Sequence, residues 1–263
     1  MQIIIPTRGR TNQQLTLQAL PSEWRKQTTL VCPKREASGL YRLYKDVEIV
    51  VEPYPMTIAQ KRGWIVQEWW KCRYDKIIML DDDLSFATRI SADDTSLRKI
   101  RGKELVPEFQ RIEDKLGPEC PHVGFGPRYN NNHDSGGWKI PGKMQCALGY
   151  YLPIVAKEVS FSLVELREDI CVTLQLLLKG HPSAVWTGTV VDQRYDTPGG
   201  CSTYRTTEMN SAEAERLAAL FPDYVTVVDK PYKSSAPRKE VVCRWQKALQ
   251  DGLNWAKNSH RYR

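Results

Sequence analysis

Residues 76–83 read Lys-Ile-Ile-Met-Leu-Asp-Asp-Asp, an apolar run that ends on three consecutive carboxylates. A short apolar run of this kind predicts a buried β-strand, and ligands bind outside the carboxyl ends of strands in an open α/β sheet. Side chains at i and i+2 of an extended segment point to the same side, so Asp81 and Asp83 could share one cation. Mg²⁺ or Mn²⁺ is typically held by one or two carboxylates together with substrate phosphates. The triplet therefore predicts a metal-dependent diphosphate site, with an acidic turn that caps the next helix as the alternative.

Strand-like and helix-like segments alternate along the first half of the chain. Residues 57–71 show the helical pattern, with Ile58, Ile65 and Trp69 at core-like spacing. Repeated strand–helix units imply an α/β fold with a parallel, doubly wound sheet. The expected strands are 2–5, 28–32, 47–52, 76–80, 122–126, 144–152, 183–191 and 224–228, and the expected helices are 11–20, 37–44, 57–71, 104–116, 168–178, 211–220 and 241–256.

The composition predicts a globular protein of a reducing compartment. A chain of 263 residues with 41% apolar residues is long enough for one large α/β domain. No stretch approaches the roughly 20 apolar residues that cross a bilayer, and the apolar start is interpreted as a first strand, not a signal peptide. Seven scattered cysteines without a Cys-x-x-Cys pair argue against a disulfide framework or zinc cage and for the cytoplasm.

The positive charge is concentrated near the C-terminus. The whole chain carries a net charge of +7, and residues 229–263 hold nine Lys/Arg and three Asp/Glu, a net charge of +6. We therefore predict a catalytic domain at 1–228 and a basic extension at 229–263. A basic extension predicts a polyanionic partner, most simply nucleic acid, with a solubilising tail as the alternative. The candidate nucleic-acid contacts are Arg238, Lys239, Arg244 and Lys247.

The first strand runs into Pro6-Thr7-Arg8-Gly9-Arg10 before a helix. A loop at this position presents backbone N–H groups, a hydroxyl and two guanidiniums to an anionic ligand. Lys61 and Arg62 follow the third strand and could reach the same phosphates, with a solvated helix surface as the alternative. The predicted donor-binding residues are Pro6, Thr7, Arg8, Arg10, Lys61, Arg62, Asp82 and Arg194.

A second acidic motif, Glu168-Asp169, opens the helix that ends at Lys179-Gly180. A first strand with a Pro-Thr loop, then Asp-x-Asp, then Glu-Asp at a helix start resembles the nucleotide-sugar glycosyltransferases of the GT-A fold. The resemblance covers residues 2–180 and implies a Rossmann-like, mixed but mainly parallel sheet flanked by helices. It also implies that Asp169 is the catalytic base, whereas capping of the helix dipole is the alternative.

Residues 192–205, Asp-Gln-Arg-Tyr-Asp-Thr-Pro-Gly-Gly-Cys-Ser-Thr-Tyr-Arg, resemble the corresponding stretch of phage TET-associated DNA glycosyltransferases. This narrower resemblance implies transfer from a nucleotide sugar, UDP-sugar first, to 5-hydroxymethylcytosine in double-stranded DNA within the host cytoplasm, with Mn²⁺ or Mg²⁺ as cofactor. The GT-A family often adds a third metal ligand, frequently His, but His181 lies too close to the preceding helix. Asp192, Asp196 and Cys201 are the other candidates for that ligand.

Two other functions remain open at this point. A nucleotidyltransferase or sugar-nucleotide pyrophosphorylase also uses a strand-end carboxylate pair with a metal. These enzymes normally need a Gly-rich phosphate loop early in the chain, and residues 6–10 contain one glycine. A non-enzymatic nucleic-acid-binding module with a structural acidic triplet is the other alternative.

Overall fold

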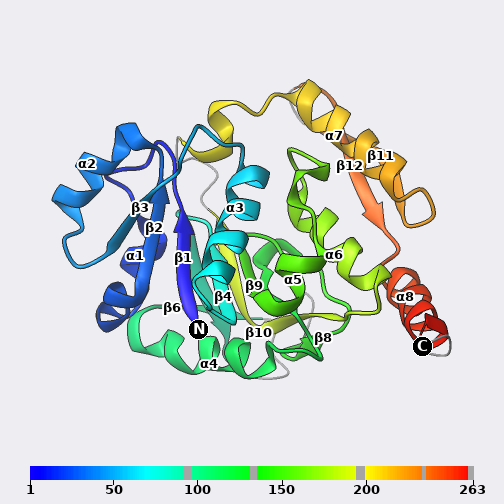
Figure 1. Ribbon diagram of the computed structural model, residues 1–263, viewed down its shortest axis with the longest axis horizontal. Coiled ribbons are helices and arrows are strands. Elements are labelled where there is room, and N and C mark those ends of the chain that lie inside the picture. Colours follow the sequence, from blue (N-terminus) through cyan, green and yellow to red (C-terminus); the bar gives the residue numbers. More distant parts are fainter. Residues whose placement is uncertain (92–95, 131–134, 194–198, 233–234, 260–263) are drawn as a thin grey trace.

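The computed structural model describes residues 1–91, 96–130, 135–193, 199–232 and 235–259. A mixed sheet lies at its centre, with helices packed along it (Figure 1). Within the described residues, no helix is both long enough and apolar enough to cross a membrane. The α/β class with a large sheet flanked by helices is therefore confirmed.

The first half of the sheet is parallel, as the sequence predicts. β1 (Gln2–Pro6) lies between β2 (Thr28–Cys32) and β4 (Lys76–Leu80), and β3 (Glu48–Val51) pairs with β2 at the edge. These strands are connected through α1 (Leu15–Ala19), α2 (Lys34–Leu43) and α3 (Ile58–Lys71). Helix α3 begins with a capping box in which Thr57 and Gln60 exchange hydrogen bonds, which explains why its start lies within one residue of the predicted one.

The second half of the sheet is mixed. Beyond β4 the strand order is β9-β7-β10-β5-β6, and among the described strands of this half only β7 and β10 form a parallel pair. β5 and β6 were not predicted, and they form a hairpin directly after the acidic triplet. The remaining strands of the sheet are β5 (Leu84–Arg89), β6 (Leu97–Ile100), β7 (His122–Pro127), β8 (Trp138–Lys139), β9 (Ala147–Tyr151) and β10 (Ser183–Gln193). The remaining helices up to residue 203 are α4 (Val106–Lys115), α5 (Leu152–Glu158), α6 (Glu168–Leu178) and the 3-10 segments Ser22–Gln27, Gly102–Leu105, Arg128–Asn130, Phe161–Leu163 and Gly200–Thr203.

The central strands are buried on both faces, which explains their continuous apolar runs. In β1, Ile3 and Ile5 join one hydrophobic cluster, whereas Ile4 joins another. In β4, Ile78 and Leu80 join the first cluster and Ile77 and Met79 the second. Because successive side chains of a strand point to opposite faces, both helical layers are needed to cover the sheet.

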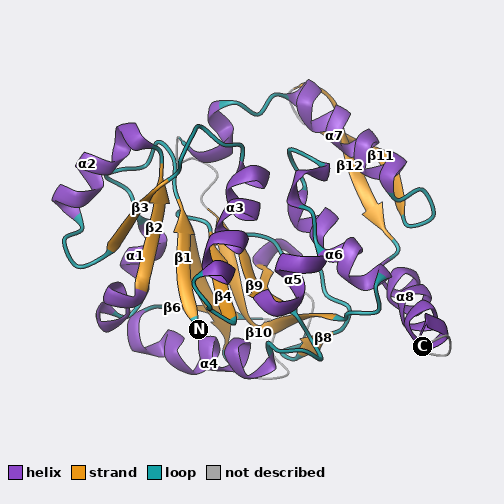
Figure 2. Cartoon of the chain, in the orientation of Figure 1, coloured by secondary structure: helices purple, strands orange, loops and turns teal. Residues whose placement is uncertain are grey.

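The C-terminal segment packs against helix α6 (Figures 1 and 2). It consists of α7 (Thr207–Leu220), the hairpin β11 (Val225–Tyr232) and β12 (Ser235–Cys243), and α8 (Trp245–Ser259). The predicted boundary at 228/229 falls within β11, and the division into two domains stays a prediction. The predicted helix start at Val241 is wrong, because Val241 and Val242 pair with Val227 and Thr226 in the hairpin.

Gly252 brings α8 close to the end of α6. A Cβ atom at this position would lie 1.9 Å from the backbone oxygen of Leu177 and 2.8 Å from the backbone nitrogen of Gly180. Real Cβ atoms do not approach this closely, so only glycine permits the contact. Ala248, one turn earlier, is fully buried in a cluster with Leu174 and Leu177 of α6. The last helix is thus an integral part of the packing around α6.

Candidate active site

One pocket of about 880 Å³ brings the predicted site residues together. It lies between the β1–α1 loop, the end of β4 and the start of α6, which come from three distant parts of the sequence. Arg194 and Asp196 lie outside the described residues, as does the side chain of Cys201. The predicted residues that line the pocket are Pro6, Thr7, Arg8, Arg10, Lys61, Arg62, Asp81, Asp82, Asp83, Asp169 and Asp192.

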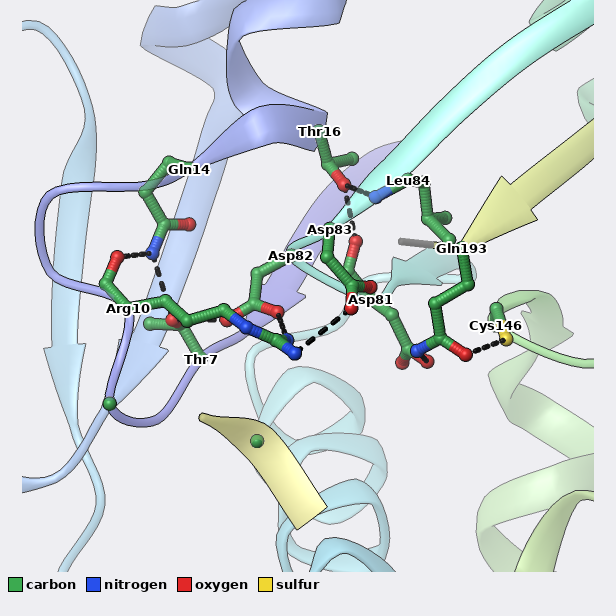
Figure 3. A network of polar contacts seen from close by, with 12 residues as sticks. Thr7, Arg10, Gln14, Thr16, Asp81, Asp82, Asp83, Leu84, Cys146 and Gln193 are labelled. Carbon is green, nitrogen blue, oxygen red and sulfur yellow. Dashed lines mark hydrogen bonds and ion pairs between the residues drawn. The ribbon is translucent and has the colours of Figure 1, made fainter. Parts of the chain in front are cut away.

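Asp82 joins the first loop to the end of β4 (Figure 3). Its Oδ1 forms an ion pair with Nη1 of Arg10, and its Oδ2 accepts a hydrogen bond of 2.5 Å from the Thr7 hydroxyl. Nη2 of Arg10 lies 3.0 Å from Oδ2 of Asp83, so one guanidinium binds two members of the triplet. Asp82 is only 3% exposed. These contacts assign Asp82 a structural part in the site, and direct contact with the donor stays a prediction.

Hydrogen bonds also hold the backbone of the acidic triplet in place. Thr16 of α1 donates through its hydroxyl to the carbonyl of Asp81 at 2.5 Å and accepts from the amide of Leu84 at 2.8 Å. Gln14 donates to the Thr7 hydroxyl at 2.8 Å and to the Arg10 carbonyl at 3.0 Å. The Gln14 side chain therefore supports the loop, and α1 begins at Leu15, later than predicted.

Asp81 and Asp83 retain coordination capacity. Oδ1 of Asp81 accepts from Arg62 at 2.6 Å, and its Oδ2 lies 3.4 Å from the Gln193 amide. Oδ1 of Asp83 is buried and accepts no hydrogen bond from the described residues. Burial, together with the nearby Asp81 carboxylate, raises the pKa of Asp83 to about 6. A positive charge between Asp81 and Asp83 would offset both the cost of burying Asp83 and its repulsion by Asp81.

The carboxylates fit a divalent cation that is also bound by substrate. Among the described residues, no group of three His, Cys, Asp or Glu could hold a metal without help. Mg²⁺ commonly takes one or two carboxylates and completes its shell with phosphates and water, which the pair of Asp81 and Asp83 allows. Two of the other candidate ligands are engaged elsewhere, since His181 lies 3.2 Å from Glu158 and Asp192 lies 3.1 Å from Arg128.

Arg62 connects the two acidic motifs. Its Nη2 lies 2.6 Å from Asp81, and its Nη1 lies 2.5 Å from Glu168 at the start of α6. The alternative of a solvated helix surface is wrong for Arg62 and Lys61, which are 4% and 3% exposed. Burial raises the pKa of Glu168 to about 7, and the Arg62 guanidinium opposes this shift. The sequence predicts a phosphate contact for Arg62 and gives no sign of this bridging position.

Lys61 and Arg8 share the buried carboxylate of Glu52. Nζ of Lys61 lies 2.7 Å from Glu52 and donates to the Thr7 carbonyl at 3.1 Å. The Arg8 guanidinium lies 3.3 Å from Glu52 and 5.8 Å from the ring centroid of Tyr204. The sequence gives no site role to Glu52, which belongs to no recognisable motif, or to Tyr204, which lies in the stretch 192–205 but carries no signal of its own.

Asp169 lies half-buried in the first turn of α6. Its Oδ1 accepts from the amide of Ile170 at 2.8 Å, and its Oδ2 accepts no hydrogen bond from the described residues. Burial raises the pKa of Asp169, whereas the Arg62 guanidinium lowers it. A carboxylate with a raised pKa and an uncommitted oxygen has the properties of a general base.

The Gly199-Gly200 pair packs on the first loop. The Gly200 amide donates to the Arg8 carbonyl at 2.7 Å. Gly199 has φ 112°, and a Cβ atom there would lie 2.8 Å from Cγ of Arg10 and 2.9 Å from the Arg8 carbonyl oxygen. The conformation and the close approach both require glycine, so the motif closes one side of the pocket.

The predicted nucleic-acid contacts do not line the pocket. Lys239 forms an ion pair with Glu215, Lys247 lies 2.7 Å from Asp251, and Arg244 is exposed. For Arg238 the backbone is described, as part of β12, but the side chain is not. Three other cations line the pocket and have no ion pair or hydrogen bond among the described residues: Lys143, Arg205 and Lys230.

The paired acidic motifs resemble those of nucleotide-sugar glycosyltransferases, and comparison with known families tests this resemblance. The profile of the TET-associated glycosyltransferase family matches residues 1–200. The chain belongs to this family and is a glycosyltransferase. A comparison with curated proteins gives no match.

Two solved structures are similar at low sequence identity. The crystal structure of A197 from STIV is 13% identical over 74% of this chain and 87% of that chain, with a TM-score of 0.42. The mannose-1-phosphate geranyltransferase from Thermus thermophilus is 13% identical over 73% of this chain and 57% of that chain, with a TM-score of 0.36. The fold class therefore rests on the sheet topology described above.

We expect Arg10→Ala to lower the free energy of unfolding by about 3–5 kcal/mol, because it leaves two buried carboxylates without their shared partner. Chemical denaturation at neutral pH measures the change. Arg35→Ala is the control, because the Arg35 side chain is 76% exposed and lies 3.7 Å from Glu36; its loss should cost less than about 1 kcal/mol. Equal effects of the two substitutions would contradict a structural role for Arg10.

Proposed function

We propose that this glycosyltransferase moves a sugar from a nucleotide-sugar donor, with a UDP-sugar as the first candidate, to the hydroxyl of 5-hydroxymethylcytosine in double-stranded DNA. The observation that carries the proposal is the Arg62 bridge, which joins Asp81 of the triplet to Glu168 of the Glu-Asp pair in one pocket. Family membership favours sugar transfer over nucleotidyl transfer and over a non-enzymatic binding module.

The donor end of the pocket is the region around the triplet. Asp81 and Asp83 would hold Mg²⁺ or Mn²⁺, which when bound offsets negative charge on the leaving nucleoside diphosphate. Among Arg8, Arg10 and Arg62, the Arg8 side chain is the most exposed at 19%. We assign a phosphate contact to Arg8, because a guanidinium can bind two oxygens of one phosphate.

Asp169 supplies the base at the other end. Its carboxylate takes the proton from the acceptor hydroxyl while that oxygen attacks the anomeric carbon and the bond from carbon to diphosphate breaks. A hydroxyl is a poor nucleophile at neutral pH, and a positioned base contributes about 10²–10⁴-fold. A single displacement of this kind inverts the anomeric configuration.

The charge distribution supports a DNA acceptor. The chain carries a net charge of +7, and Lys143, Arg205 and Lys230 line the pocket without an ion pair or hydrogen bond among the described residues. These cations complement the sugar–phosphate backbone. The hydroxymethyl group lies in the major groove, and the base could be reached there or flipped into the pocket at a cost of a few kcal/mol.

We expect Asp169→Asn to lower turnover about 10²-fold or more with little change in donor affinity, because proton transfer matters only in the transition state. The assay is mass spectrometry of hydroxymethylated duplex DNA after incubation with a panel of nucleotide sugars. Only ionised Asp169 accepts a proton, so wild-type activity should fall with decreasing pH through a pKa above the ordinary value of 3.8. Unchanged turnover of the variant would leave Asp169 as a helix cap.

We expect activity to disappear in EDTA and to return on addition of Mn²⁺ or Mg²⁺. Asp83→Asn should weaken metal-dependent donor binding, because the buried Oδ1 of Asp83 has no other partner among the described residues. Calorimetry of nucleoside diphosphate binding with and without Mn²⁺ measures the effect. Glu104→Gln, at an exposed carboxylate outside the pocket, is the control. Full turnover in EDTA would exclude metal dependence.

We expect DNA affinity to fall steeply with salt, by about 100-fold between roughly 50 and 200 mM if about four phosphates are contacted. Two sets of glutamine substitutions compare the candidate surfaces. One set replaces Lys143, Arg205 and Lys230 at the pocket, and the other replaces Arg238, Lys239, Arg244 and Lys247.

Substitution of the set that contacts DNA should make DNA affinity less dependent on salt and should raise KM for DNA. Substitution of Lys34, Arg35 and Arg42 on α2, all exposed and outside the pocket, is the control. Binding that is insensitive to salt would contradict the DNA acceptor while leaving sugar transfer in place.

A further inference from the structure

Arg167, directly before the Glu168–Asp169 pair, has a left-handed backbone conformation. It occupies the N-cap of α6 with φ 66° and ψ 25°. This conformation is unfavourable for a residue with a Cβ atom and persists only where the surroundings enforce it. The Arg167 carbonyl accepts the first helical hydrogen bond, from Cys171 at 3.0 Å. The backbone at Arg167 therefore sets the direction of the turn that carries Asp169.

The Arg167 side chain is held by β12. Its Nη1 lies 3.1 Å from the Glu240 carboxylate, and its Nη2 donates to the Lys239 carbonyl at 2.9 Å. The side chain is 10% exposed, and its Nε is buried without a hydrogen-bond partner among the described residues. An ion pair and a hydrogen bond to backbone thus fasten the N-cap to the hairpin.

The two preceding residues are held by α7. Oε2 of Glu213 accepts from the amide of Glu165 at 2.6 Å and from the amide of Leu166 at 3.5 Å. Glu213 is 8% exposed. Residues 165–167 are therefore contacted by two carboxylates that both come from the C-terminal segment.

Packing reinforces these polar contacts. Val164, Ile170 and Leu174 share a buried cluster with Leu217 of α7 and Val225 of β11. All these partners lie beyond residue 200, where the match to the family profile ends. The helix that carries Asp169 is thus completed by a part of the chain outside the family match.

We propose that Glu213 and Glu240 are positioning residues, which fix Asp169 by holding residues 165–167 in the left-handed entry to α6. The inference rests on the proposed function, in which Asp169 accepts the proton. Glu240 also lines the pocket, whereas Glu213 does not; in this role each carboxylate determines the backbone path that places the base. Misplacement of a reacting group by about 1 Å can cost about 10²-fold in rate.

Glu240→Gln should lower kcat about tenfold or more while KM for the donor stays unchanged, because the triplet is not altered. Arg167→Gly should keep more activity than Arg167→Ala, because glycine adopts the left-handed conformation without a Cβ penalty. In the Arg167→Gly background, Glu240→Gln should cause no further loss. Equal activity of the Gly and Ala variants, or independent effects of Arg167→Gly and Glu240→Gln, would overturn the proposal.

Glu215→Gln is the matched control. Glu215 lies on the same helix as Glu213 and contacts β12 through the ion pair with Lys239, but its side chain is 57% exposed and does not contact residues 165–167. It should leave kcat unchanged. If Glu240→Gln does not fold, the comparison of Gly and Ala at position 167 decides the question.

Hydrogen exchange separates this inference from the proposed function, because it needs no substrate. Glu240→Gln and Glu213→Gln should speed amide exchange in the first turn of α6, at Cys171 and its neighbours, and Glu215→Gln should not. Wild-type turnover of the Asp169→Asn variant would contradict the proposed function. If Asp169→Asn loses turnover while Glu240→Gln keeps both its kcat and its amide exchange rates, only the positioning role is contradicted.

Discussion

The two ion pairs of the buried Arg62 guanidinium are the interactions on which the site depends. It lies between Asp81 at the end of β4 and Glu168 at the start of α6, two carboxylates that would otherwise repel each other in a poorly solvated space. A charge this buried is costly unless it is paired and hydrogen-bonded, so Arg62 and its two partners require one another. The bridge fixes the distance between the region that would receive the donor and the proposed base.

Elsewhere in the donor region, a buried charged group again binds two partners of opposite charge. Arg10 holds Asp82 and Asp83, and Glu52 holds Lys61 and Arg8. Replacing buried ion pairs with apolar side chains is often neutral or stabilising, so these networks are weak evidence of stability as such. Their value here is geometric, because each pair ties a loop to a strand end or helix start. The Oδ1 of Asp83, which accepts no hydrogen bond from the described residues, is then placed by a rigid frame.

The C-terminal segment completes this frame from the opposite side. Its hairpin and helices cover the outer face of α6, and Arg167 joins the hairpin to the N-cap of that helix. A basic composition suggested an appendage, but much of the segment is a packing partner. Lys239 and Lys247 pair with carboxylates of the same segment, while Lys143, Arg205 and Lys230, which have no ion pair or hydrogen bond among the described residues, line the pocket.

Local patterns in the sequence determined the elements that carry the motifs. The apolar run of β4 and the acidic start of α6 predicted both elements with the observed bounds, because burial on both faces and first-turn acidity are local properties. Only the tertiary structure decided which charges are neutralised. Arg62 meets Glu168 across 106 residues, and no local periodicity encodes such a pairing. The same holds for Val241 and Val242, whose place in a strand depends on the partner strand. The left-handed Arg167 likewise depends on Glu240, a distant carboxylate that makes an otherwise unfavourable conformation stable.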